Sequence, residues 1–338
     1  MKGSIESRES ILQDVAPKPR SIVVWGAAAV LAALPFVISV PLATEILIWG
    51  IFGMGFNLLL GYTGVLSFGH AAYFGLGAYG AGLALRYWNV GIWAGIAVGV
   101  AASILLACFI GVLAIRRRGV YFAMISLAFG QMLYFLALSP LKHITRGEDG
   151  LTHIPLVDVF SIPLHKPMPI YYFILAIAVT MVYLTWRILQ SPFGRLLRAF
   201  RENEERAKAC GYNTTLVKFF TLVLSALYGG LAGALNTLYL NYVPLATLFW
   251  LTSGTIVMMT ILGGKGTLLG PLVGAAVFLF LQNTISLYTP RWELFVGSFF
   301  VIIILAFPGG IMGTLQLFLI DRKMARLQKK AAAVPSGG

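Results

Sequence analysis

Long apolar runs, separated by short polar segments, follow one another along most of the chain. A transmembrane α-helix needs roughly 20 consecutive, mostly apolar residues. We predict ten membrane spans, at residues 22–40, 42–60, 71–86, 91–115, 119–139, 169–189, 218–240, 252–263, 268–288 and 292–312. The pattern therefore predicts an all-α, polytopic bundle of transmembrane helices over residues 22–312, between an N-terminal tail (1–21) and a C-terminal tail (313–338) that is amphipathic and then disordered.

Two of these spans, residues 71–86 and 252–263, are short and bounded by glycine, so we expect half-helices or tilted elements there. Polar, glycine-rich segments adjoin them, at residues 61–70 and at residues 263–270 before Pro271. Non-helical backbone at membrane depth survives only where it is buried in protein or lines a wet cavity. Both segments are therefore either parts of a gate or pathway, or ordinary turns near the cytoplasmic face.

Composition supports the membrane assignment. Apolar residues make up 59% of the 338 residues and charged residues only 11%, whereas about 25% of a soluble domain is charged. These values exclude soluble and disordered classes. The chain has 25 Lys and Arg against 12 Asp and Glu, and 20 of the 25 cations face the cytoplasm if the N-terminus lies inside. Cytoplasmic loops typically carry such an excess, so we expect both termini in the cytoplasm and no nucleic-acid binding.

The acidic residues bear on the source of energy. None lies at the middle of a span, and Glu45 and Glu293 lie near the outer ends of spans. Ion-coupled carriers usually hold buried carboxylates or histidines, which disfavours a secondary carrier; a passive channel is a further alternative. The string Gly263–Thr267 lacks two residues of the Walker A pattern. We therefore expect no enzyme activity, cofactor or metal site, and active transport would need an energy-supplying partner.

Uncharged polar side chains in and beside the spans are the candidates for a translocation path. The candidates are Asn57, Thr63, Ser67, His70, Asn236 and Thr260. The alternative is that each satisfies a neighbouring backbone group, and for His70 a structural hydrogen bond is the preferred interpretation. Glycines recur at a spacing of four, as at Gly229 and Gly233. Such spacing permits close helix contacts, and packing within the subunit is preferred over a dimer seam or a path.

Residues 191–211 predict an amphipathic helix on the cytoplasmic side. Ser191 suits a cap, Pro192 the first helical position and Gly211 the exit. One face is apolar and the other carries charges of both signs, which favours docking of a cytoplasmic protein over a flat position on lipid. On the opposite side, the loop 140–168 is a gate, a landing site for an extracytoplasmic partner, or a connector.

Four segments carry a family resemblance. Gly61–Ala71 closely resembles the N-terminal signature of LivM-type permeases, which belong to branched-chain amino acid ABC importers. Arg118–Met124 resembles the next block of that family, residues 198–213 its cytoplasmic coupling motif, and Gly263–Pro271 a further block. Together they cover residues 45–312, nearly the whole membrane region.

The resemblance implies an all-helical permease subunit of an ABC importer in a bacterial or archaeal cytoplasmic membrane. It implies transport of branched-chain or other amino acids, or alternatively of urea or short amides. The implied partners are a second, LivH-type permease subunit, two cytoplasmic ATPase subunits, and a periplasmic or lipid-anchored substrate-binding protein. The residues that would couple to the ATPases are Arg198, Arg201, Glu202, Asn203, Glu204, Ala207 and Gly211.

Overall fold

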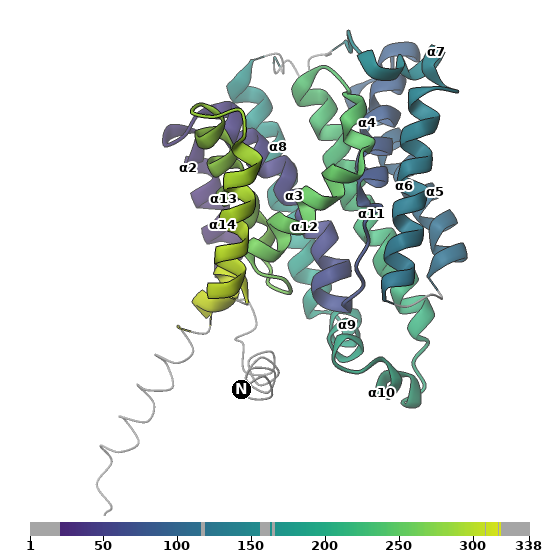
Figure 1. Ribbon diagram of the computed structural model, residues 1–338, viewed down its shortest axis with the longest axis vertical. Helices are drawn as coiled ribbons and strands as arrows, with labels where there is room; N and C mark the ends of the chain where they lie inside the picture. Colours follow the sequence, from purple (N-terminus) through teal and green to yellow (C-terminus); the bar gives the residue numbers. More distant parts are fainter. Residues whose placement is uncertain are drawn as a thin grey trace, which may run out of the picture.

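The computed structural model describes residues 21–115, 119–155, 163, 166–307, 309–316 and 318, and over these ranges the protein is α-helical without a β-strand (Figure 1). The all-α prediction is thus confirmed. Residues 1–20 of the N-terminal tail and most of the tail 313–338 lie outside the described residues, so the predictions for them are not tested, and the same holds for residues 116–118 and for most of residues 156–165.

Each of the ten predicted apolar segments contains a helix. These helices are α2 (Ser21–Ala33), α3 (Val40–Thr63), α4 (His70–Tyr87), α5 (Ile92–Ala114), α6 (Val120–Leu138), α8 (Pro167–Gln190), α11 (Thr214–Leu240), α12 (Trp250–Gly263), α13 (Gly270–Ser286) and α14 (Trp292–Ala306). Short helices connect them: η1 (Leu34–Phe36), α7 (Lys142–Thr145), η2 (Gly147–Asp149), α9 (Pro192–Glu202), α10 (Glu204–Ala209) and η3 (Leu245–Leu248). Proline in the first two positions begins α3, α8, α9 and α13, because proline lacks only an amide that has no partner there.

The helices differ in their ability to span a membrane. In the described part of the chain, six segments are long and apolar enough to cross: α3, α5, α6, α8, α11 and the candidate span Trp292–Gln316, which starts with α14 and continues past Ala306. The apolar helix α12 has 14 residues and reaches about 21 Å, less than the hydrocarbon core of roughly 30 Å. The protein is therefore a multi-pass membrane protein, while a count of ten complete crossings stays a prediction.

Glycines allow the helices at the centre of the bundle to pack closely. A Cβ placed on Gly233 of α11 would lie 1.9 Å from the carbonyl oxygen of Phe74 in α4, and one on Gly77 would lie 2.2 Å from that of Gly230. The backbones of α4 and α11 are thus in direct contact. Lipid supplies no hydrophobic drive between helices, so such close packing is a main source of their association. This glycine line packs within the chain, in agreement with the preferred interpretation.

Short connecting helices lie at both ends of the bundle. α9 and α10 lie together at one end, and α7 lies at the other, which we call the α7 end (Figure 1). Near the α7 end, Leu151 and Val243 exchange two backbone hydrogen bonds of 3.0 and 2.9 Å. Arg86 also donates to the carbonyl oxygen of Thr152. The first part of the loop 140–168 is therefore attached to α4 and to the α11–α12 connection.

Candidate functional site

Residues 191–211 form two helices, not the single helix expected. α9 begins as predicted, with Pro192 at its start and the Ser191 hydroxyl accepting the amide of Gly194 at 3.3 Å. Asn203 then leaves the helical conformation (φ −158°, ψ 102°), and its Oδ1 accepts the amide of Arg206 at 2.9 Å. The single-helix prediction was wrong because asparagine followed by two glutamates is itself a signal for a helix start.

Lys218 of α11 contacts both α9 and α10. Nζ of Lys218, in the first turns of α11, lies 2.9 Å and 3.1 Å from the two carboxylate oxygens of Glu204 in α10. The same Nζ lies 5.1 Å from the centroid of the Phe200 ring in α9. Only 7% of the Lys218 side chain and 21% of the Glu204 side chain are exposed. A charge pair this shielded depends on both partners, since removal of one leaves the other buried and uncompensated.

Arg201 connects α9 with the end of α3. Its Nη1 donates to the carbonyl oxygen of Gly61 at 2.5 Å, one of the last carbonyls of α3, which have no partner within the helix. A Cβ on Gly266 would lie 2.5 Å from the same Nη1. The guanidinium thus fills the space between α3 and the loop that joins α12 to α13.

Asn57 of α3 also binds the loop that joins α12 to α13. Its Oδ1 accepts the amide of Gly266 and its Nδ2 donates to the carbonyl oxygen of Thr267, both at 2.8 Å. The Thr267 hydroxyl donates in turn to the carbonyl oxygen of Gly264 at 2.7 Å. The glycine-rich segments 61–70 and 263–270 therefore meet, and α9 touches both. The path role of Asn57 stays a prediction, beside its observed role as a backbone partner.

His70 lies inside the bundle at the start of α4. Its Nε2 is 2.7 Å from the Ser225 hydroxyl, which donates its own proton to the carbonyl oxygen of Gly55 at 2.5 Å. His70 must therefore donate from Nε2, and within the described residues its Nδ1 has no partner. The ring packs among aromatic side chains of α3 and α4. A structural hydrogen bond is thus observed, as preferred for this residue.

The remaining path candidates differ in their surroundings. The Thr63 hydroxyl donates to the carbonyl oxygen of Leu59 at 2.5 Å within α3. The hydroxyls of Ser67 and Thr260 are buried without a partner among the described residues. Asn236 lies half-buried on α11 and lines a cavity in the opposite half of the bundle from α9 and α10. Their assignment to a translocation path stays a prediction.

A polar cavity of about 480 Å³ lies between α10 and the start of α11. Glu204 and Gly211, two of the residues implied in coupling, line it together with Lys218 and Asn213. Gly211 adopts φ +86°, a conformation that glycine takes without strain, and so turns the chain from α10 towards α11. The Asn213 side chain caps α11 by accepting the amide of Leu216 at 3.1 Å.

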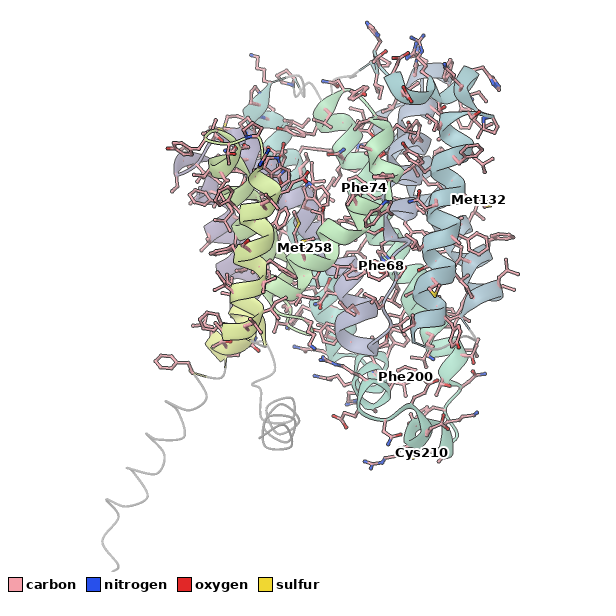
Figure 2. All side chains as sticks on the ribbon, viewed as in Figure 1. Phe68, Phe74, Met132, Phe200, Cys210 and Met258 are labelled. Carbon is pink, nitrogen blue, oxygen red and sulfur yellow. The ribbon has the colours of Figure 1, made fainter. Side chains whose placement is uncertain are left out.

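The other residues implied in coupling divide between the bundle and the surface. Arg198 turns inward, where its Nη2 donates to the carbonyl oxygen of Leu189 at 3.2 Å. Ala207 is buried, whereas Glu202 and Asn203 are exposed. Sequence reasoning missed Lys218, although the signal was available: it is a lone charge at the start of the apolar run 218–240. Figure 2 shows Phe200 and Cys210 at this end of the molecule.

Comparison with known proteins identifies the family. Residues 38–306 match the family described as branched-chain amino acid transport system / permease component. The chain is 25% identical to the "High-affinity branched-chain amino acid transport system permease protein LivM" of Salmonella typhimurium, over 83% of this chain and 72% of the relative.

Two further relatives match shorter parts. The "Probable branched-chain amino acid transport permease protein LivM" of Methanocaldococcus jannaschii is 31% identical over 44% of this chain and 43% of its own length. The "Ribose import permease protein RbsC" of Haemophilus influenzae is 27% identical over 45% of this chain and 47% of its own length. No solved structure matches the chain significantly. Because the family match spans most of the helical bundle, the chain belongs to the branched-chain amino acid transport permease family, as a membrane permease of the ABC importer type.

Proposed function

We propose that this chain is one of two membrane subunits of an ABC importer that carries branched-chain amino acids into the cell. The family match and the LivM relatives support this substrate class. The other members of the assembly are a second, LivH-type permease subunit, two ATPase subunits in the cytoplasm, and a substrate-binding protein outside. Both termini lie in the cytoplasm, as the distribution of Lys and Arg favours.

The observation that carries the proposal is the attachment of α9 and α10 to the bundle. Lys218 binds these helices to α11, and Arg201 binds them to α3 and to the α12–α13 loop. A force applied by an ATPase to the exposed side of α9 and α10 therefore reaches three elements of the membrane domain. Closure of the ATPases then switches the permease between outward-open and inward-open states.

The subunit composition and the substrate are tested by purification of the tagged, full-length chain from native membranes in mild detergent. We expect a related permease and two ATP-hydrolysing subunits to co-purify. The cognate binding protein should bind leucine, isoleucine or valine in titration calorimetry more tightly than urea or ribose. An isolated chain that takes up leucine under an ion gradient, with no ATPase attached, would overturn the proposal. A binding protein selective for urea or ribose would overturn the substrate assignment.

The docking position is tested by charge reversal at the exposed surface of α9. Glu202→Arg should abolish most ATP-driven uptake and lower substrate-stimulated ATP hydrolysis, because Glu202 is exposed on α9, where we place the ATPase contact. Glu293→Arg is the matched control, since Glu293 is also exposed but lies at the start of α14. Wild-type uptake by an assembled Glu202→Arg permease would show that α9 is not the coupling element.

A further inference from the structure

A second cavity, of about 260 Å³, lies in the half of the bundle away from α9 and α10. Its lining includes Glu45, Trp49, Phe74, Asn236, Leu279 and Gln282, and Figure 2 places Phe74 within this half. Pockets for drug-sized ligands measure roughly 300–1,000 Å³. The cavity is therefore of a size that suits a small metabolite.

Three residues with polar side chains, each from a different helix, line this space. Glu45 comes from α3, Asn236 from α11 and Gln282 from α13. Within the described part of the chain, none of the three makes a hydrogen bond or an ion pair. The hydroxyls of Thr247 and Thr252 differ, because each donates to a backbone carbonyl at 2.8 Å. The carboxylate and the two amides thus keep their hydrogen-bonding capacity for another molecule.

The position of Glu45 makes a purely structural role costly. It is the sixth residue of α3, about 8 Å along the helix from its start, and its side chain is half-buried. Ionisable residues inside membrane segments are expensive and usually functional. A carboxylate held in the wall of a cavity that two free amides also line is explained by a ligand that brings a positive charge.

The rest of the wall is apolar and aromatic. The rings of Trp49 and Phe74 stack with centroids 5.8 Å apart and an angle of 23° between their planes. Leu279 of α13 is buried at 5% exposure. Trp49 follows Glu45 by one helical turn, so both side chains lie on the same face of α3. The cavity therefore combines one negative charge, two amides and an apolar surface.

We propose that this cavity binds an apolar amino acid as it crosses the membrane. The Glu45 carboxylate pairs with the α-ammonium group, the amides of Asn236 and Gln282 donate to the α-carboxylate, and Trp49 and Phe74 contact the apolar side chain. This inference rests on the proposed function and adds the residues that select a zwitterion over an uncharged amide or a sugar. A charge-assisted hydrogen bond lost in a site of this kind costs at least about tenfold in binding.

The test measures ATP-driven uptake of radiolabelled leucine by the complete importer in proteoliposomes, with ATP hydrolysis measured in parallel. Glu45→Gln should lower leucine uptake at least about tenfold, while ATP hydrolysis stimulated by leucine-loaded binding protein stays within about twofold of the wild type. Glu45→Asp, which keeps the charge, should recover part of the uptake. Asn236→Ala and Gln282→Ala should each lower uptake in the same way, so the test does not depend on one variant.

Glu293→Gln and Asn283→Ala are the matched controls, because both side chains are exposed and neither lines the cavity. Full leucine uptake by Glu45→Gln overturns the site, and so does a parallel loss of uptake and ATP hydrolysis, which indicates a structural role. Failure of the wild-type importer to move leucine, isoleucine or valine overturns the proposed function instead. The two failures are therefore distinguishable.

Discussion

Nη1 of Arg201 donates a hydrogen bond of 2.5 Å to the carbonyl oxygen of Gly61, which precedes it by 140 residues. The contact joins a short helix at one end of the bundle to the last turn of α3. Gly266 lies beside the same guanidinium, so this one side chain reaches both glycine-rich interruptions of the membrane domain. We expect such a connection to transmit displacement of α9 directly to α3 and to the α12–α13 loop.

Replacement of Arg201 should therefore uncouple the assembly. Arg201→Ala removes a charge-assisted hydrogen bond worth about 1.5–3 kcal/mol, and we expect ATP-driven leucine uptake to fall about tenfold or more while ATP hydrolysis continues. Arg201→Lys should recover only part of the uptake, since a lysine lacks the planar fork of arginine. Arg291→Ala is the control, because Arg291 is exposed just before α14 and lies outside α9 and α10. Uptake and hydrolysis that stay coupled in Arg201→Ala would refute this role.

The ion pair between Lys218 and Glu204 should contribute to folding stability asymmetrically. Glu204→Gln leaves the more buried ammonium without a counter-charge, at a cost of about 1–3 kcal/mol. Lys218→Met should cost less, because a fifth of the Glu204 side chain is exposed to water. The apparent Tm of the purified permease in detergent measures both effects. The double variant should lose less than the sum of the single variants, and the exposed Lys208→Met should change nothing; a strictly additive double variant would contradict the pairing.

Close helix packing should make Gly233 sensitive to substitution, whereas Gly254 should tolerate it. A Cβ at Gly233 would lie 1.9 Å from a backbone oxygen of α4, whereas a Cβ at Gly254 of α12 meets nothing within 4 Å. Overpacking against backbone costs about 1–3 kcal/mol or more, so Gly233→Ala should lower the apparent Tm and the yield of monodisperse protein. Gly254→Ala should leave both unchanged or slightly improved. Size-exclusion chromatography after heating compares the two, and equal behaviour would refute the packing argument.

The orientation in the membrane can be read from a native cysteine. Cys210, directly after α10, is exposed, whereas Cys108 is half-buried within α5. A membrane-impermeant maleimide should label Cys210 in inside-out vesicles but not in intact cells whose outer face is accessible. Cys210→Ser should remove that labelling. Labelling of Cys210 from outside would place α9 and α10 on the wrong side for ATPases and would invert the proposed topology.

Helix positions were predictable because lipid imposes a simple rule on the sequence. A run of apolar residues must satisfy its own backbone, so each of the ten runs contains a helix. The start of α9 was also predictable, since Ser191 and Pro192 are local signals for a helix start. The break at Asn203 was missed because the periodicity of the apolar face was given more weight than the asparagine followed by two glutamates.

The clusters that carry the proposals depend on contacts between distant residues. Asn57 and Thr267 are 210 residues apart, and Glu45, Asn236 and Gln282 come together only when α3, α11 and α13 pack. Glu45 was assigned to the end of a span from its sequence position, whereas the packed helices make it part of a cavity wall. Such contacts follow from glycine-mediated packing of whole helices, which local sequence patterns do not encode.

The central claim, ATP-driven import of amino acids through this permease, is tested most directly by leucine uptake into proteoliposomes. The vesicles contain the purified, complete importer, with binding protein outside and ATP inside. The account predicts that leucine accumulates only with ATP inside the vesicles and does not accumulate when a non-hydrolysable analogue replaces ATP. Accumulation should persist after all ion gradients are dissipated. Accumulation without ATP under a proton or sodium gradient, or no accumulation of any branched-chain amino acid by an assembly that hydrolyses ATP, would contradict it.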